Sequence, residues 1–70
     1  MQLSARNQLS GTVKAVKEGA VMAEVVVTLD GGADVVSAIT VDSVHRLKLA
    51  VGSKVTVIVK ATEVMLATGD

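Results

Sequence analysis

Valine is the residue that most constrains how this chain can fold. It occupies 15 of the 70 positions, and phenylalanine, tryptophan and tyrosine are all absent. Side chains branched at Cβ lose rotamer freedom in a helix and pack well on the pleated surface of a sheet. Half of the residues are hydrophobic, so there is enough apolar material for a core built from small side chains. We therefore expect an all-β fold, with residues 1–70 forming one domain.

The short length creates a stability problem. A domain of fewer than about 70–80 residues rarely gains more than roughly 3–5 kcal/mol from its core, and small proteins compensate with disulfides, metals or oligomerisation. The chain has no cysteine, which excludes disulfides and thiolate metal sites. Oligomerisation is the remaining common solution, so we expect the protein to self-associate.

Several segments carry the alternating pattern of short strands. In residues 9–17, Leu9, Val13 and Ala15 share one face, and the interior Gly11 indicates a bulge or a close backbone approach. The other expected strands span residues 21–29, 35–39, 55–60 and 63–67.

The connections between these strands are also readable. Asp30-Gly31-Gly32 is typical of a hairpin, because glycine adopts the positive φ that tight turns need. Thr40 can cap a short helix that runs through Leu47, with its hydroxyl accepting a hydrogen bond from the amide of Asp42 or Ser43. Five strands with one short helix between the third and the fourth follow the order of an OB-like barrel.

Some apolar side chains fall on the face opposite the expected core. They are Val26, Val36, Ala38 and Ile58. In a lone five-stranded barrel these side chains would face water, and a subunit interface is their simplest location. The pattern therefore strengthens the expectation of an oligomer.

The charge balance excludes several kinds of partner. Seven basic and seven acidic residues give a formal net charge of zero, which argues against a polyanionic partner or an anionic membrane surface. The lack of aromatic rings argues against the stacking platform with which OB proteins hold single-stranded nucleic acid. No secretory signal or transmembrane run is found, so we expect a cytoplasmic protein.

Catalytic and metal-binding patterns are not found in the sequence. There is no Ser/His/Asp arrangement, carboxylate pair, phosphate-binding loop or metal-ligand cluster. His45 is the one histidine, and we expect it on the solvent-facing side of the helix rather than in a metal site. From the sequence we therefore expect no catalytic activity and no metal site.

A few donor side chains suit a small oxyanion. A fully ionised tetrahedral oxyanion accepts hydrogen bonds and cannot donate them, so its site should contain donors alone. The side chains of this type are Ser4, Arg6, Thr40, Ser43 and Lys60, to which the amides near Ala5 and at the helix start can be added. Spacing alone does not assemble them, because each is also typical of an ordinary terminal charge, strand-end lysine or helix cap.

Motifs along the whole sequence indicate how these donor side chains could be brought together. The relevant stretches are Ser4-Ala5-Arg6-Asn7, Leu9-x-Gly11-x-Val13, Glu18-Gly19-Ala20-Val21-Met22-Ala23-Glu24-Val25, Gly31-Gly32, Ala38-Ile39-Thr40 with Ser43 and Leu47, Gly52-x-x-Val55, and Val59-Lys60-Ala61 with Val64. On these stretches the chain resembles the molbindin (Mop) family of small molybdate-binding proteins, and the related domains of a molybdate-responsive regulator and of molybdate-importer ATPases.

This resemblance implies a hexamer, a trimer of dimers, that stores or buffers molybdate or tungstate bound between subunits. One class of site would use Ser4, Ala5, Arg6, Lys60 and Ala61 of one subunit, facing Thr40 and Ser43 of its neighbour. A second class, near the threefold axis, would use Gly19, Ala20, Val21 and Met22. The alternatives are an OB-type nucleic-acid-binding module and a purely structural oligomer.

Met22 departs from the pattern of the family, because many of its members carry asparagine there. An amide side chain can donate a hydrogen bond to an anion and a thioether cannot. The second site would then be weaker or built from backbone amides, unless methionine simply fills a gap at an interface.

Overall fold

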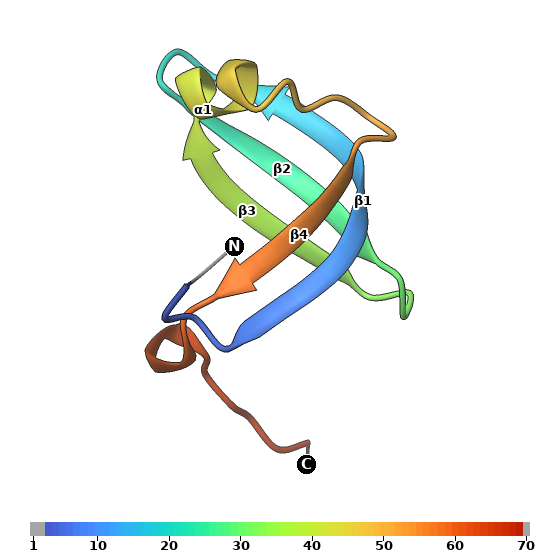
Figure 1. Cartoon of the computed structure of the whole chain (residues 1–70), viewed down its shortest axis with the longest axis vertical. Coiled ribbons are helices and arrows are strands. Elements are labelled where there is room, and N and C mark those ends of the chain that lie inside the picture. Colours follow the sequence, from blue (N-terminus) through green and yellow to red (C-terminus); the bar gives the residue numbers. More distant parts are fainter. Residues whose placement is uncertain (1–2, 70) are drawn as a thin grey trace.

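The computed structural model describes residues 3–69. Its one antiparallel sheet has the spatial order β3-β2-β1-β4 and consists of β1 (Asn7–Glu18), β2 (Met22–Leu29), β3 (Asp34–Thr40) and β4 (Lys54–Val59). Helix α1 (Val41–Arg46) follows β3, and the short 3₁₀ helix η1 (Ala61–Glu63) follows β4. The sheet curls into a half-barrel, with α1 at one end and η1 at the other (Figure 1). A mostly β fold with one short helix between the third and fourth strands is thus confirmed.

The long strand β1 belongs to both sides of the curled sheet. Its first half pairs with β4 and its second half with β2, and Gly11 pairs with both Leu29 and Val55. A Cβ atom at Gly11 would lie 2.6 Å from Cγ1 of Val27 and 2.8 Å from the carbonyl oxygen of Thr28. The close backbone approach predicted for Gly11 is therefore present, and it allows β1 to bend tightly over β2.

A β-bulge changes which side chains of β1 face inward. The pairing register with β2 shifts between Val13 and Ala15. Beyond this shift Ala15 is exposed, and Val16 packs against the core instead. The prediction that Ala15 shares the inner face with Val13 is wrong, because one extra residue in a strand reverses the alternation that follows it.

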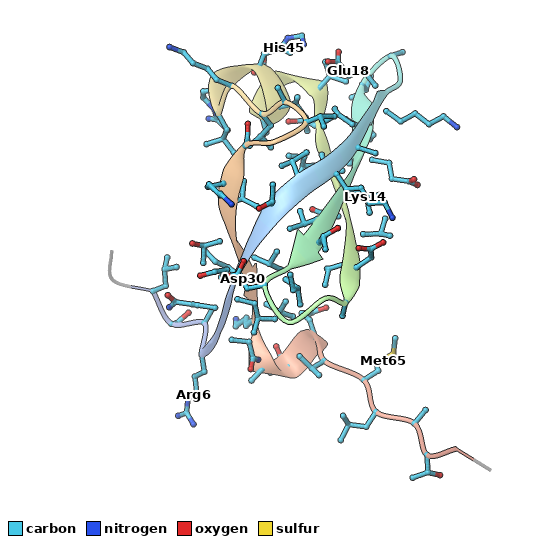
Figure 2. The ribbon with its side chains drawn as sticks, turned by 90° about the vertical axis from the view of Figure 1, so that its right-hand side faces the viewer. Arg6, Lys14, Glu18, Asp30, His45 and Met65 are labelled. Atoms are coloured by element: carbon cyan, nitrogen blue, oxygen red, sulfur yellow. The ribbon has the colours of Figure 1, made fainter. Side chains whose placement is uncertain are left out.

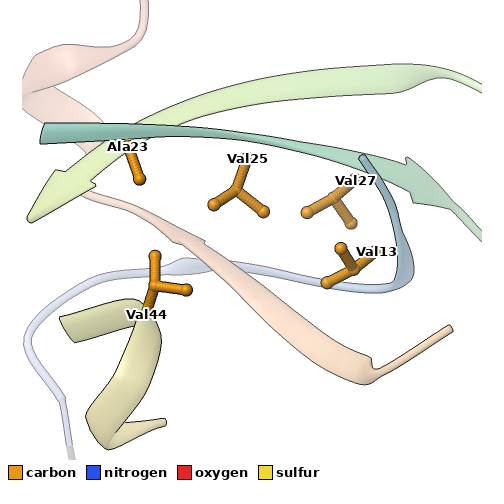
Figure 3. Close-up of a cluster of buried hydrophobic side chains, with 5 residues drawn as sticks. All are labelled: Val13, Ala23, Val25, Val27 and Val44. Carbon is orange, nitrogen blue, oxygen red and sulfur yellow. The ribbon is translucent and has the colours of Figure 1, made fainter. Parts of the chain in front are cut away.

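The core is small and aliphatic. Its buried members are Val13, Ala23, Val25, Val27 and Val44 (Figure 3). Four of them come from β1 and β2, the two central strands, and Val44 comes from α1, which covers the end of the half-barrel. The position of Val44 fixes α1 on the sheet and thereby fixes the polar residues that begin this helix.

The local signals for the helix and the hairpin are confirmed. The hydroxyl of Thr40 caps α1 by accepting a hydrogen bond of 3.0 Å from the amide of Ser43. In the hairpin between β2 and β3, the amide of Leu29 donates to the carbonyl of Ala33 at 2.7 Å. Gly32 adopts a φ of 104° there, a conformation that other residues rarely take.

The fifth strand predicted at residues 63–67 is not formed. Within the described part of the chain, η1 takes residues 61–63 and the stretch from 64 to 69 has no regular structure. This segment leaves the body of the molecule (Figure 1), with Met65 92% and Leu66 93% exposed. A strand needs a neighbour to satisfy its backbone groups, and this segment has none alongside it.

Without that strand, the half-barrel stays open between its two edge strands. A cavity of about 210 Å³ is lined by aliphatic side chains of both edges, among them Ile39 of β3 and Val57 of β4. On the outer face, Val36 is 62% and Ile58 43% exposed, as the sequence pattern indicates. The single chain therefore leaves apolar surface uncovered both at its open side and on its back.

Candidate functional site

The first group of candidate donors lies at the end of the molecule where β1 begins and β4 ends. The last residue pair between these strands joins Asn7 and Val59, and the amide side chain of Asn7 donates to the carbonyl of Val59 at 3.1 Å. Arg6 and Lys60 are the next residues on each strand beyond this pair. The structure thus brings the Ser4-Ala5-Arg6 segment next to Lys60-Ala61, although more than fifty positions separate them in the sequence.

The two cations of this group are available to a ligand. Arg6 and Lys60 are exposed, and Arg6 extends outward from the body of the molecule (Figure 2). Within residues 3–69, neither side chain forms an ion pair or a hydrogen bond with another protein group. We call Ser4, Ala5, Arg6, Lys60 and Ala61 the cationic half-site.

A second group of donors lies at the start of α1. The hydroxyl of Thr40 donates to the hydroxyl oxygen of Ser43 at 2.8 Å and accepts from the amide of Ser43 at 3.0 Å. Arg46, one helical turn later, donates from Nη2 to the same Ser43 oxygen at 3.1 Å. We call Thr40 and Ser43 the hydroxyl half-site.

The two half-sites lie at opposite ends of the folded molecule. Thr40, in the hydroxyl half-site, pairs with Met22 at the beginning of β2. The other end of β2, at Leu29, pairs with Gly11 of β1, and Arg6 lies five residues before Gly11. The eight residues of β2 span about 23 Å at about 3.3 Å per residue. Hydrogen bonds to one small anion need donors within about 3 Å of its oxygens, so a single chain cannot bring both half-sites to the same ion.

The turn residues predicted for the second site lie beside the hydroxyl half-site. The turn between β1 and β2 is closed by the amide of Gly19, which donates to the carbonyl of Met22 at 2.8 Å. The amide of Val41 donates to the carbonyl of Val21 at 2.8 Å, which ties the start of α1 to this turn. Gly19, Ala20, Val21 and Met22 are all exposed, so both candidate sites draw on this end of the molecule.

Two contacts at the same end were not predicted from the sequence. His45 is exposed, as expected, but its Nε2 lies 3.1 Å from Oε1 of Glu18, so it links α1 to the end of β1 (Figure 2). The other is the hydrogen bond from Arg46 to Ser43. Arg46 and Ser43 are three residues apart in a helix, a spacing that could have revealed this hydrogen bond. No local sequence signal connects Glu18 with His45.

The most strongly coupled charges lie elsewhere, on the outer face of the sheet. Nζ of Lys14 is 2.9 Å from Oδ2 of Asp34, and Thr28 donates to Oδ1 of the same carboxylate at 2.7 Å. The hydrogen bonds from Lys14 and Thr28 hold the pKa of Asp34 below its ordinary value, and the bond with Asp34 raises the pKa of Lys14. These three residues connect β1, β2 and β3, so their role is structural.

Among residues 3–69, no three histidine, cysteine, aspartate or glutamate side chains gather where they could hold a metal ion. None of the helices in that range is long and apolar enough to cross a membrane.

Comparison with known proteins finds relatives that match most of this chain. The model of the TOBE domain matches residues 3–66. Molybdenum-pterin-binding protein 3 of Clostridium pasteurianum is 48% identical over 66 residues, which cover 94% of this chain and 97% of that protein. The resemblance described from the sequence motifs is thereby confirmed.

Solved structures agree with this result. A molybdate-binding protein from Sporomusa ovata superposes with a TM-score of 0.91 at 47% identity, and the match covers 97% of this chain and all of that one. The cytoplasmic molybdate-binding protein ModG, solved with molybdate bound, superposes with a TM-score of 0.84 at 44% identity, over 87% of this chain and 43% of that one.

Proposed function

Because the chain belongs to the family of TOBE domains that includes the molybdenum-pterin-binding proteins, we propose that it binds molybdate or tungstate and stores or buffers the ion inside the cell. The observation that carries this proposal is the division of the donors into two half-sites at opposite ends of the folded molecule. Each half-site offers hydrogen-bond donors without a complete shell for an anion. Copies of the chain must therefore meet to build a site.

The proposed site joins the cationic half-site of one subunit to the hydroxyl half-site of another. Arg6 and Lys60 supply positive charge, and hydroxyls and backbone amides supply the remaining donors. Hydrogen bonds between cationic donors and an anion are roughly twice as strong as neutral ones. Their strength rises further when a subunit interface excludes water. Binding is non-covalent and reversible, and the protein acts as a binding protein rather than an enzyme.

Size and protonation account for the proposed selectivity. Molybdate and tungstate are larger tetrahedra than sulfate, so they can reach donors on two subunits that a smaller ion cannot reach together. Phosphate is partly protonated near neutral pH and then presents a donor of its own to a site made of donors. The proposed site therefore prefers molybdate or tungstate to both of these smaller ions.

Self-association is supported by the apolar surface of the single chain. Met65 and Leu66 are almost fully exposed, and Val36 on the outer face is 62% exposed. The open side of the half-barrel adds a cavity lined by aliphatic side chains. Surfaces of this kind mark contacts between proteins, and a second copy of the chain is the proposed partner. The family resemblance leads us to propose a hexamer, and the similarity to ModG, a cytoplasmic molybdate-binding protein, supports a cytoplasmic location.

The turn between β1 and β2 is proposed as a weaker, second site. Its exposed backbone from Gly19 to Met22 lies beside the start of α1. The thioether of Met22 donates no hydrogen bond, so any anion held there depends on backbone amides gathered from several subunits.

Equilibrium dialysis with elemental analysis tests the proposal. The parent protein should retain molybdate at a fixed ratio per chain, with sulfate competing poorly. Arg6→Ala and Lys60→Ala should each weaken binding by about 1.5–3 kcal/mol, the usual contribution of a hydrogen bond to a charged group. Lys54→Gln is the matched control, because it removes one charge from the first residue of β4, whereas Lys60 follows the last residue of that strand.

Either of two results would contradict the proposal. The first is a parent protein that retains no molybdate, with or without retention of single-stranded DNA. The second is molybdate binding by Arg6→Ala and Lys60→Ala that is as tight as binding by Lys54→Gln. Retention of DNA in place of molybdate would favour the nucleic-acid-binding alternative, and retention of neither would favour a purely structural oligomer.

A further inference from the structure

The two hydroxyls of the hydroxyl half-site share their hydrogens in a way that limits what they can offer a ligand. A serine or threonine hydroxyl has one hydrogen to donate and two lone pairs that accept. Thr40 and Ser43 lie 2.8 Å apart, hydroxyl to hydroxyl, so one of their two hydrogens is used in the bond between them. Thr40 also accepts from the Ser43 amide. Only one hydroxyl hydrogen remains for an anion, and lone pairs that face the anion would repel it.

Arg46 changes this balance at Ser43. A guanidinium has five N–H donors and no acceptor, so the 3.1 Å contact between Arg46 Nη2 and Ser43 Oγ can only be a bond that Ser43 accepts. Together with the bond from Thr40, it fills both lone pairs of the Ser43 oxygen. The hydrogen of Ser43 is then left free to point away from both partners, toward whatever faces the half-site.

The charge of Arg46 is also uncompensated. Asp42 precedes it by four residues on α1, a spacing that often forms an ion pair. Within residues 3–69, however, no carboxylate lies within ion-pair distance of Arg46. The bond from this cation therefore withdraws electron density from the Ser43 oxygen and makes its O–H a stronger donor.

We propose that Arg46 is a positioning residue of the oxyanion site, which acts by holding the Ser43 hydroxyl as a donor toward the ion. This inference rests on the proposed function and adds to it a residue outside the predicted donor set. Arg46 need not touch the ion, because its effect passes through the Ser43 oxygen. Removal of Arg46 leaves a lone pair of Ser43 unfilled, and the hydroxyl can then rotate to present that lone pair to the anion.

Calorimetric titration of the assembled protein with sodium molybdate tests this role. Arg46→Ala should weaken binding about tenfold, in the range expected for a lost charge-assisted hydrogen bond. Arg46→Lys keeps a cationic donor and should recover most of the affinity. Lys48→Gln is the matched control, since it removes one charge two residues further along without a bond to Ser43, and its affinity should equal that of the parent.

A double-mutant cycle separates positioning from a general effect of charge. If Arg46 acts through Ser43, then Arg46→Ala should have almost no further effect in a Ser43→Ala background. Preference for molybdate over sulfate should fall in Arg46→Ala and be unchanged in Lys48→Gln. Thermal unfolding should be the same in Arg46→Ala as in the parent, because the side chain is exposed.

The outcomes distinguish this inference from the function on which it rests. A parent that binds molybdate, with Arg46→Ala binding equally well, overturns the role of Arg46 and leaves the proposed function intact. The same holds if Arg46→Ala weakens binding as much in the Ser43→Ala background as in the parent. A parent that binds no molybdate overturns both.

Discussion

Substitution of Gly11 by alanine should destabilise this protein more than any other single methyl group added to a glycine. The new Cβ would lie 2.6 Å from Cγ1 of Val27, 2.8 Å from the carbonyl oxygen of Thr28 and 3.3 Å from Cα of Leu29. Favourable contacts between carbon atoms occur at about 3.5–4.0 Å, so all three are too close. Overpacking usually costs about 1–3 kcal/mol. Two of the three neighbours are backbone atoms of β2 that cannot rotate away, so we expect about 3 kcal/mol.

Circular dichroism in the far ultraviolet is the suitable assay, because the chain has no tryptophan or tyrosine to report by fluorescence. A loss of 1 kcal/mol lowers Tm by about 4–8 °C in a domain of this size, so Gly11→Ala should melt about 12–24 °C below the parent. All proteins must be compared at one concentration, since self-association contributes to the apparent stability.

Gly31→Ala provides the control for this experiment. It adds the same methyl group in the hairpin, where no atom lies within 4 Å of the new Cβ, and it should change stability by no more than about 0.5 kcal/mol. If Gly11→Ala melts at the same temperature as Gly31→Ala, then β1 does not approach β2 closely at position 11, and the tight bend of β1 over β2 is wrong.

Three further predictions concern the core, the charges and the assembly. Val44→Ala should lower the free energy of unfolding by about 1.5–3 kcal/mol, because it leaves a cavity under α1; urea titration checks this, and an unchanged midpoint would contradict the packing of α1. The pKa of Asp34 is lowered in the folded state, so its contribution to stability is present above its ordinary value of 3.8 and is lost as the pH falls through the lower folded value. The parent should therefore lose more Tm than Asp34→Asn between neutral pH and a pH below 3.8, and equal losses would show that the Lys14 contact is unimportant. Light scattering should give a mass several times the 7.1 kDa of one chain, whereas a monomer would contradict the shared site.

Local signals predicted most of the fold. The cap at Thr40 and the glycines of the hairpin act through neighbouring backbone atoms, so their effect can be read from a few residues. The bulge after Val13 could not be found in this way, because Val13, Lys14 and Ala15 show no break in the alternating pattern. A bulge depends on the pairing of two strands, and the sequence of one strand does not contain that information.

The predicted strand at residues 63–67 failed for a related reason. Val64 and Leu66 have the composition of a strand, but within this chain the segment has no neighbouring strand to pair with. Strand propensity reports how a side chain fits a sheet that already exists. The sequence could indicate an apolar segment here but not whether its partner belongs to the same chain.

For the candidate site, the chemistry of the donors was predictable and their grouping only partly so. The types of side chain needed by an oxyanion select Arg6, Lys60 and Ser43 directly. The pairing of β1 with β4, which brings Arg6 next to Lys60, is a long-range contact and required the structure. The bond from Arg46 to Ser43 follows helical spacing, but an arginine near the end of a helix is also favoured by the helix dipole, so the sequence alone does not single out this contact.

The claim that one ion is shared by two subunits can be tested by mixing two defective proteins. Arg6→Ala has a defective cationic half-site and Ser43→Ala has a defective hydroxyl half-site, and both are studied at a molybdate concentration at which neither retains the ion. Equal amounts of the two variants are unfolded together and refolded. If the subunits assemble at random, about a quarter of the interfaces should join the intact hydroxyl half-site of Arg6→Ala to the intact cationic half-site of Ser43→Ala. We predict that the mixture retains about a quarter of the molybdate bound by the parent protein after the same treatment. If the refolded parent binds molybdate and the mixture retains none, both half-sites of each ion come from the same chain, and the shared site is wrong.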